Sequence, residues 1–97
     1  MPRMRRIRRV GFEPGIVFFK PAGVAMRDLE EVVLEVDEFE ALRLSDFEKM
    51  NQSQCAEKMG VSQPTFNRIL SSAREKIASA LVEGKAIRIQ GGHYSLH

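Results

Sequence analysis

The fold of this chain is decided at residues 51–69, NQSQCAEKMGVSQPTFNRI. The apolar side chains recur at helical spacing on either side of a glycine. The first group is Cys55, Ala56 and Met59, and the second is Phe66 and Ile69, with Val61 at the corner between the two helices. Gly60 has no Cβ, so it readily adopts the left-handed conformation that ends many helices. We predict two helices that cross at a tight turn, which is a helix-turn-helix. A helical hairpin that binds no DNA is the alternative interpretation.

Polar residues mark the start of both predicted helices. Asn51 and Gln54 have the spacing of a capping box, in which each side chain bonds the backbone N–H of the other. Ser62 is a favourable N-cap residue, and Pro64 falls in the first turn, where a missing N–H costs little.

The second helix of the motif is predicted to be long. Its apolar positions are Phe66, Ile69, Leu70, Ala73, Ile77, Ala80 and Leu81. The apolar face lasts to about Val82, and Gly84 is a plausible stop. A helix of about 20 residues spans roughly 30 Å, which is more than a major groove requires. We expect its far half to pack on the N-terminal strands or on a second subunit.

The sequence around the motif predicts an α+β fold that is mainly α. Residues 10–36 carry phenylalanine and β-branched residues between prolines and glycines, which indicates short strands and turns. Within them, residues 26–36 fit either a helix or a strand. Residues 85–96 predict a β-hairpin around Gly91-Gly92. This hairpin is interpreted either as a DNA-contacting wing or as part of a sheet with the N-terminal strands.

A support helix is expected before the motif. Asp37 has the pattern of an N-cap, with Glu40 as its capping-box partner, and the helix is predicted to end near Lys49 or Met50. Its apolar side consists of Phe39, Leu42, Leu44 and Phe47. Together with the motif, this helix gives a predicted helical core over residues 37–82.

Length and composition limit the class of protein. The chain has 97 residues, one cysteine and a formal net charge of +2, which suits a single domain over residues 1–97. No apolar run approaches the roughly 20 residues that span a membrane, and the N-terminus lacks the apolar core of a signal peptide. A lone cysteine excludes an internal disulfide and is typical of cytosolic proteins. We expect a cytoplasmic protein without membrane contact.

The charged residues are sorted along the chain. Five arginines lie in the first nine residues, and nine of the 13 acids lie between Asp28 and Glu48. Residues 1–9 are expected to form a mobile basic arm that contacts phosphates or enters a minor groove, or else a solubilising tail. The acids of residues 28–48 are interpreted as a solvated face or as a surface for protein contact.

The candidate DNA-binding residues follow from helix geometry. If Phe66 and Ile69 point inward, the opposite face of the second helix is polar. Asn and Gln can pair with adenine and Arg with guanine, whereas hydroxyls near a helix start suit phosphates. The motif candidates are Ser62, Gln63, Pro64, Thr65, Asn67, Arg68, Ser71 and Arg74, and the arm candidates are Arg3, Arg5, Arg6, Arg8 and Arg9. The alternative is that the motif candidates are merely solvated.

The whole chain resembles a prokaryotic family of predicted DNA-binding proteins, uncharacterised protein family 0251, also called domain of unknown function 134. The resemblance is carried by MPR at 1–3, RRV at 8–10, FKPAG at 19–23, DEFEALRL at 37–44, the motif at 52–69, EGKA at 83–86, Gly91-Gly92 and Tyr94. Residues 37–81, with Arg74-Glu75-Lys76, also resemble the sigma-factor region that reads the upstream promoter element. These resemblances imply DNA binding in transcriptional control, with contact to the transcription machinery as a further possibility.

The sequence offers little support for an enzyme. No catalytic constellation, cofactor motif or metal site is recognisable: His93 and His97 would lie about 13 Å apart on one strand face, too far to share a metal. We therefore predict no enzyme and no cofactor. The predicted function is sequence-specific binding of double-stranded DNA by a homodimer or higher homo-oligomer. The alternatives are a protein-interaction adaptor that uses the acidic 28–48 surface and a non-specific nucleic-acid binder that uses the basic arm.

Overall fold

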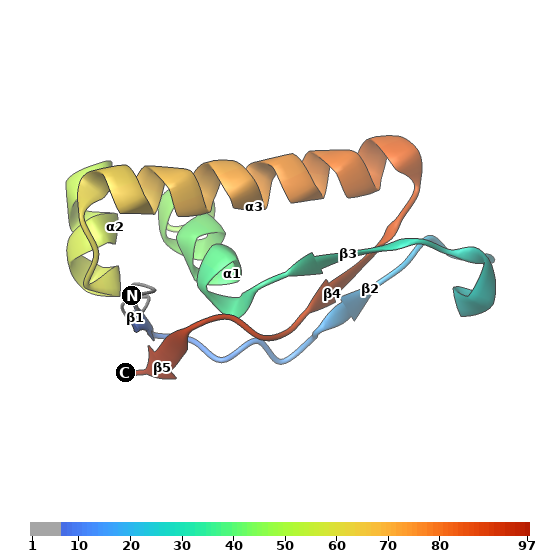
Figure 1. The fold of residues 1–97 in the computed structure, drawn as a ribbon, viewed down its shortest axis with the longest axis horizontal. Helices are drawn as coiled ribbons and strands as arrows, with labels where there is room; N and C mark the ends of the chain where they lie inside the picture. Colours follow the sequence, from blue (N-terminus) through green and yellow to red (C-terminus); the bar gives the residue numbers. More distant parts are fainter. Residues whose placement is uncertain (1–6) are drawn as a thin grey trace, which may run out of the picture.

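The computed structural model describes residues 7–97, so expectations for residues 1–6 lie outside it. One long helix, α3 (Gln63–Glu83), runs along most of the molecule (Figure 1). α2 (Gln52–Met59) lies at its N-terminal end, and α1 (Val36–Leu42) packs beneath its first half. A small sheet lies beneath its second half. The predicted fold class, α+β and mainly α, is confirmed.

The strands form two separate sheets. β4 (Ala86–Ile89) is the centre of a three-stranded sheet, antiparallel to β2 (Phe18–Phe19) and parallel to β3 (Glu31–Leu34). β1 (Arg8–Val10) and β5 (Tyr94–Leu96) form a parallel pair. The N-terminal strands are thus present as predicted.

The predicted C-terminal hairpin is wrong, although both of its strands exist. β2 and β3 occupy the two edges of β4, so no edge remains for β5, which pairs with β1 instead. Both Gly91 and Gly92 have positive φ, and the backbone oxygen of Gly91 accepts a bond from the N–H of Val36. The glycines therefore carry the chain past the start of α1 to the second sheet. The alternative, strands that complete sheets with the N-terminal segment, is the correct one.

Residues 26–36 contain both kinds of structure that the sequence left open. A single 3-10 turn, η1 (Met26–Asp28), is followed by strand β3 and then by the start of α1. The alternating pattern of Val32, Leu34 and Val36 therefore describes a strand as far as Leu34, whereas Val36 begins α1. Leu34 is the one residue of β3 that is buried.

The support helix differs from the prediction at both ends. Its N-cap is Glu35, which forms a capping box with Glu38, whereas Asp37 lies within the first turn. After Leu42 the helix widens into a π-helical turn, η2 (Arg43–Phe47), in which the N–H of Glu48 bonds the oxygen of Arg43. A wider turn rotates the residues that follow. This explains why Phe47 is 77% exposed although helical spacing placed it inside.

Two apolar clusters form the core. The first lies under the motif and consists of Ala41, Leu44, Cys55, Ala56, Met59, Phe66, Ile69 and Leu70. The second joins α1 and α3 to both sheets and consists of Val10, Leu34, Val36, Ala73 and Ile89. The predicted inner face of α3 is confirmed up to Ala80, but Leu81 is 75% exposed. None of the helices among the described residues is long and apolar enough to cross a membrane.

Three carboxylates of α1 are buried, contrary to a solvated acidic face. They belong to Asp37, Glu38 and Glu40, each at most 4% exposed. Glu40 accepts two hydrogen bonds from Arg43, at 2.7 and 2.9 Å, and one from the N–H of Gly11 at 2.8 Å. Buried carboxylates need such partners, and these ones hold α1 to the elements around it. They are not available to a protein partner.

Candidate nucleic-acid interface

The helix-turn-helix forms with the caps that the sequence predicted. Asn51 and Gln54 exchange their capping-box hydrogen bonds at 2.8 and 3.3 Å. Gly60 has φ 68° and ψ 34° and ends α2 in the left-handed conformation. Ser62 caps α3 by accepting the N–H of Thr65 at 3.3 Å. Each end of the turn is therefore fixed by local bonds, which holds the start of α3 in a defined place.

The apolar side chains of the motif all point inward. Cys55, Met59 and Phe66 are fully buried, and Ala56 and Ile69 are buried to more than nine-tenths. Burial raises the pKa of the Cys55 thiol, which agrees with its interpretation as a small core filler. The polar residues of the first turns of α3 consequently face away from the core.

The motif candidates lie on one outward surface. Exposed among them are Ser62, Gln63, Pro64, Arg68, Ser71 and Arg74, whereas Thr65 and Asn67 are half-buried. The Thr65 hydroxyl oxygen accepts from the Ser62 hydroxyl at 3.0 Å and from Arg68 Nη2 at 3.1 Å. A guanidinium has five N–H donors, so Arg68 keeps donors for a base edge while Thr65 holds it in position.

The sequence did not single out Gln52, which shares this surface. Its side-chain oxygen accepts a hydrogen bond from Asn67 at 3.4 Å. Gln52 is exposed at the first helical position of α2, directly after the Asn51 cap. That position leaves a backbone N–H without a helical partner and could have identified it as a candidate for phosphate contact.

Two basic residues further along α3 are held by carboxylates. Arg74 donates two hydrogen bonds to Asp46, at 2.6 and 3.1 Å, and these bonds hold the pKa of Asp46 below its ordinary value. Lys76 Nζ lies 2.7 Å from Glu38 Oε1. Within the described part of the chain, Arg68 is thus the one basic residue of α3 without a carboxylate partner. Arg74, one of the candidate DNA-binding residues, is already paired with Asp46.

Two of the five arginines assigned to the predicted basic arm lie in a strand. Arg3, Arg5 and Arg6 lie outside the described residues, but Arg8 and Arg9 belong to strand β1. Arg8 is buried, with its Nε 3.8 Å from Asp37 Oδ2, and so faces away from solvent. It is placed as an interior ion pair rather than as a DNA contact.

Arg9 lies against the motif itself. A Cβ built on Gly60 would be only 3.0 Å from Arg9 Nε, so the exposed guanidinium covers the turn between α2 and α3. A positive charge beside the C-terminal end of α2 is also electrostatically favourable. Of the described arm candidates, Arg9 is the exposed one beside the motif, whereas the buried Arg8 lines a small cavity with Thr65 and Arg68.

The basic residues that a DNA-contacting wing over residues 85–96 would use are also paired with carboxylates. Arg88 donates to both carboxylate oxygens of Glu31, at 3.0 and 2.9 Å, and lies 4.6 Å from the ring centre of Phe18. Lys85 lies 3.3 Å from Glu83 and 3.5 Å from Glu30. These contacts join strands and loops of one sheet. Among the described residues, no group of three or more His, Cys, Asp or Glu side chains suits a metal ion.

Comparison with known proteins identifies the family. The family described as "Protein of unknown function DUF134" matches residues 1–97. The chain belongs to this family. A "UPF0251 protein" from Moorella thermoacetica is 62% identical over 96 residues, covering 99% of this chain and 64% of that protein.

Two further relatives give the same result. A "UPF0251 protein" from Pelotomaculum thermopropionicum is 56% identical over 96 residues, covering 99% of this chain and 73% of the relative. One from Thermoanaerobacter pseudethanolicus is 55% identical over 97 residues, covering 100% of this chain and 82% of the relative. The chain thus spans a little under two thirds of the Moorella protein and more of the others. No solved structure matches the chain significantly.

Proposed function

We propose that this protein binds double-stranded DNA at specific sequences through the outward face of α3 and regulates transcription. The observation that carries the proposal is the surface formed by Gln63, Asn67, Arg68 and Ser71. Its side chains have the donors and acceptors that read base edges, and they stand on a helix whose start is fixed by Ser62. Because the DNA of a prokaryotic cell lies in the cytoplasm, a protein with this function acts there.

The local charges favour this surface over others on the molecule. Among the described residues, Arg68 is exposed and donates only to a neutral hydroxyl, whereas Arg74 and Arg88 each donate two hydrogen bonds to one carboxylate. A phosphate or base contact by Arg68 therefore breaks no ion pair. The adaptor alternative loses support, because the Glu38 and Glu40 carboxylates are buried.

The test is selection of bound sequences from a random pool of double-stranded DNA, at near-physiological salt, for the wild type and two variants. Arg68→Ala removes one charge from the candidate surface, and Arg27→Ala removes the same charge from η1 at the opposite end of the molecule. Arg27 is exposed and takes no part in a described ion pair. The two variants therefore match in net charge and differ in place.

We expect Arg68→Ala to relax preference at one or two base pairs, a loss of about 1–3 kcal/mol or roughly 5- to 150-fold in discrimination. Arg27→Ala should leave the selected motif unchanged. Unaltered sequence preference in Arg68→Ala would refute the assignment of the reading surface. Binding without any enriched motif would favour the non-specific nucleic-acid binder instead.

A further inference from the structure

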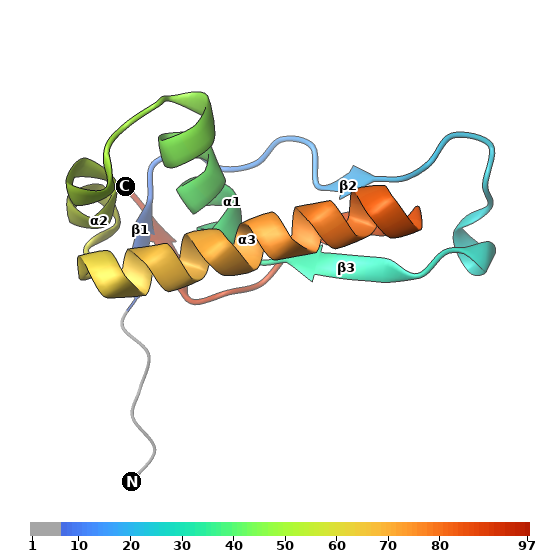
Figure 2. The ribbon, with the colours of Figure 1, turned by 90° about the horizontal axis from the view of Figure 1, so that it is seen from above.

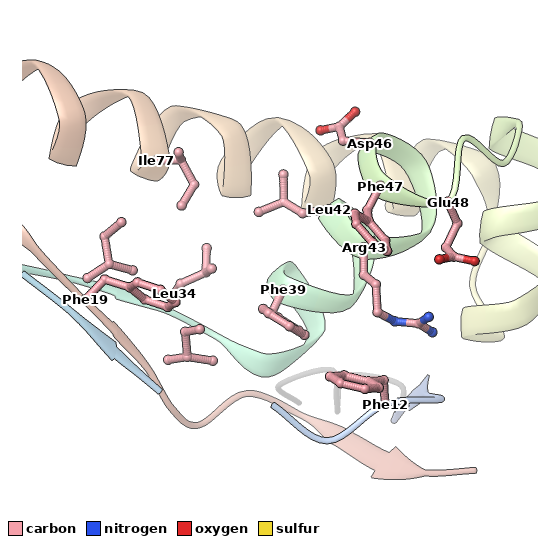
Figure 3. Close-up of a pocket in the computed structure, with 12 residues that line it drawn as sticks. Phe12, Phe19, Leu34, Phe39, Leu42, Arg43, Asp46, Phe47, Glu48 and Ile77 are labelled. Carbon is pink, nitrogen blue, oxygen red and sulfur yellow. The ribbon is translucent and has the colours of Figure 1, made fainter. Parts of the chain in front are cut away.

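A wide apolar groove lies beside α3. Its lining includes residues of α1 and β2, two elements that lie on the same side of α3 in Figure 2. Its volume is about 890 Å³. Figure 3 shows side chains from four parts of the chain around it: Phe19 from β2, Phe39 from α1, Ile77 from α3 and Phe12 from the segment after β1. Phe47 of η2 closes one end. None of the candidate DNA-binding residues within 7–97 lines it.

The apolar surface extends beyond the groove. Phe12 is 50%, Phe19 51% and Phe47 77% exposed. Leu81 follows Ile77 by one helical turn on the same face of α3 and is 75% exposed. With about 200 Å² for each aromatic side chain, the three phenylalanines leave about 360 Å² of apolar surface in contact with water, and the smaller Leu81 side chain adds roughly 100 Å², for a total of about 450 Å². A small ligand inside the groove would leave Leu81 and much of Phe47 uncovered.

This area is what one partner contributes to a stable dimer. A standard interface buries about 800 Å² per partner, of which roughly 56–65% is apolar. The apolar share is therefore about 450–520 Å², which the four residues supply. The remaining area can come from the polar residues around the groove.

The charges at the end of the groove nearly balance. Arg43, Asp46 and Glu48 lie together beside Phe47. Arg43 is paired with Glu40 and Asp46 with Arg74, so this end carries both signs with little excess of either. In a two-fold dimer each patch meets its own copy. A surface of mixed charge and large apolar area suits such a contact. Because its net charge is small, this surface has no strong electrostatic attraction for a highly charged partner.

We propose that a second copy of this chain covers the groove, through a two-fold contact that includes Phe47, Phe19 and Leu81. The contact uses the last turns of α3, whereas the candidate reading residues lie in its first turns, so the dimer presents two copies of them. Only this last consequence rests on the proposed DNA binding. The dimer itself is a property of the free protein.

The test measures the molar mass of the full chain without DNA, by sedimentation velocity across a dilution series. Adjacent exposed residues provide a matched pair of variants. Leu81→Glu places a charge beside the groove, whereas Val82→Glu places the same charge about 100° further around α3, where the side chain is 86% exposed. Both lie in the last turn of the helix, so their effects on helix stability should be alike.

We expect a wild-type dimer whose dissociation constant rises about 30-fold or more in Leu81→Glu and in Phe47→Glu. Val82→Glu should change it by less than about threefold. Circular dichroism checks that the variants are folded. A folded wild type that is monomeric throughout, or equal dissociation constants for Leu81→Glu and Val82→Glu, would overturn the proposal. Because no DNA is present, either result is independent of the proposed function.

Discussion

The buried ion pair between Glu38 and Lys76 should account for much of the attachment of α1 to α3. Glu38 Oε1 accepts the N–H of Glu35 at 2.8 Å and Lys76 Nζ at 2.7 Å, while Oε2 accepts the hydroxyl of Ser72. The Glu38 side chain is 6% and the Lys76 side chain 31% exposed. The carboxylate therefore depends on the protein for its partners, whereas the ammonium still reaches water.

The expected contribution of this ion pair to the free energy of unfolding follows from the difference in exposure between its two side chains. Exposed pairs contribute up to about 1 kcal/mol, and hydrogen bonds to charged groups about 1.5–3 kcal/mol. Glu38→Gln keeps the shape and the capping-box acceptor but loses the charge, so we expect about 2 kcal/mol of destabilisation. For the pair, a coupling free energy of about 1.5 kcal/mol is expected, between the two limits.

A double-mutant cycle isolates this coupling. The free energy of unfolding is measured by urea denaturation for the wild type, Glu38→Gln, Lys76→Met and the double variant. Circular dichroism is the suitable signal, because the chain has no tryptophan. Lys58→Met, an exposed change on α2, is the control and should stay within about 0.5 kcal/mol. A coupling below about 0.5 kcal/mol would refute the view that this pair joins the two helices.

Three further results are expected from single residues. Gly60→Ala should lower the free energy of unfolding by about 1–2 kcal/mol, because φ is 68° there. Gly15→Ala, where the added Cβ meets open space, should cost less than half as much, and equal losses of stability in thermal unfolding would contradict this. The Cys55 thiol, buried and with a raised pKa, should react at least about 100-fold more slowly with a thiol reagent in the native protein than in urea, and equal rates would show that the motif opens freely. The lowered pKa of Asp46 means that its pairing with Arg74 stabilises the fold above the ordinary pKa near 4 and stops doing so as pH falls through the lowered value. Asp46→Asn should therefore cost up to about 1 kcal/mol at pH 7 and nothing once the pH is below the lowered pKa, and a cost that does not depend on pH would point to packing instead.

The motif could be predicted because its signals are local. The caps at Asn51 and Ser62, the left-handed Gly60 and the two buried faces each involve residues within a few positions of one another. Helical spacing and capping chemistry are sufficient to specify such structure. The surface that carries the candidate residues follows from the same spacing, because fixing Phe66 inward fixes Arg68 outward.

The sheets could not be predicted in the same way, because strand pairing depends on distant segments. Nothing near Gly91-Gly92 reveals that both edges of β4 are already taken by β2 and β3. The buried carboxylates are a second case. An acid on a helix is usually solvated, and only the packing of β1 and α3 against α1 shows that Glu38 and Glu40 are internal. Phe47 is a third, because the π-helical turn that exposes it interrupts the helical spacing.

The length of α3 connects the two proposals quantitatively. Arg68 precedes the turn between Ile77 and Leu81 by about 16 Å, at 1.5 Å per residue. If the two helices run antiparallel past a two-fold axis at that turn, the two Arg68 side chains stand about 32 Å apart. One turn of DNA measures about 34 Å. A dimer formed through the groove should therefore select a palindrome whose half-sites are centred about 10 base pairs apart. Direct repeats, or half-sites two turns apart, would show that the axis does not pass through the groove. α3 is longer than a helix that only reads a major groove needs to be. In this dimer, its second half sets the distance between the two candidate DNA-binding surfaces.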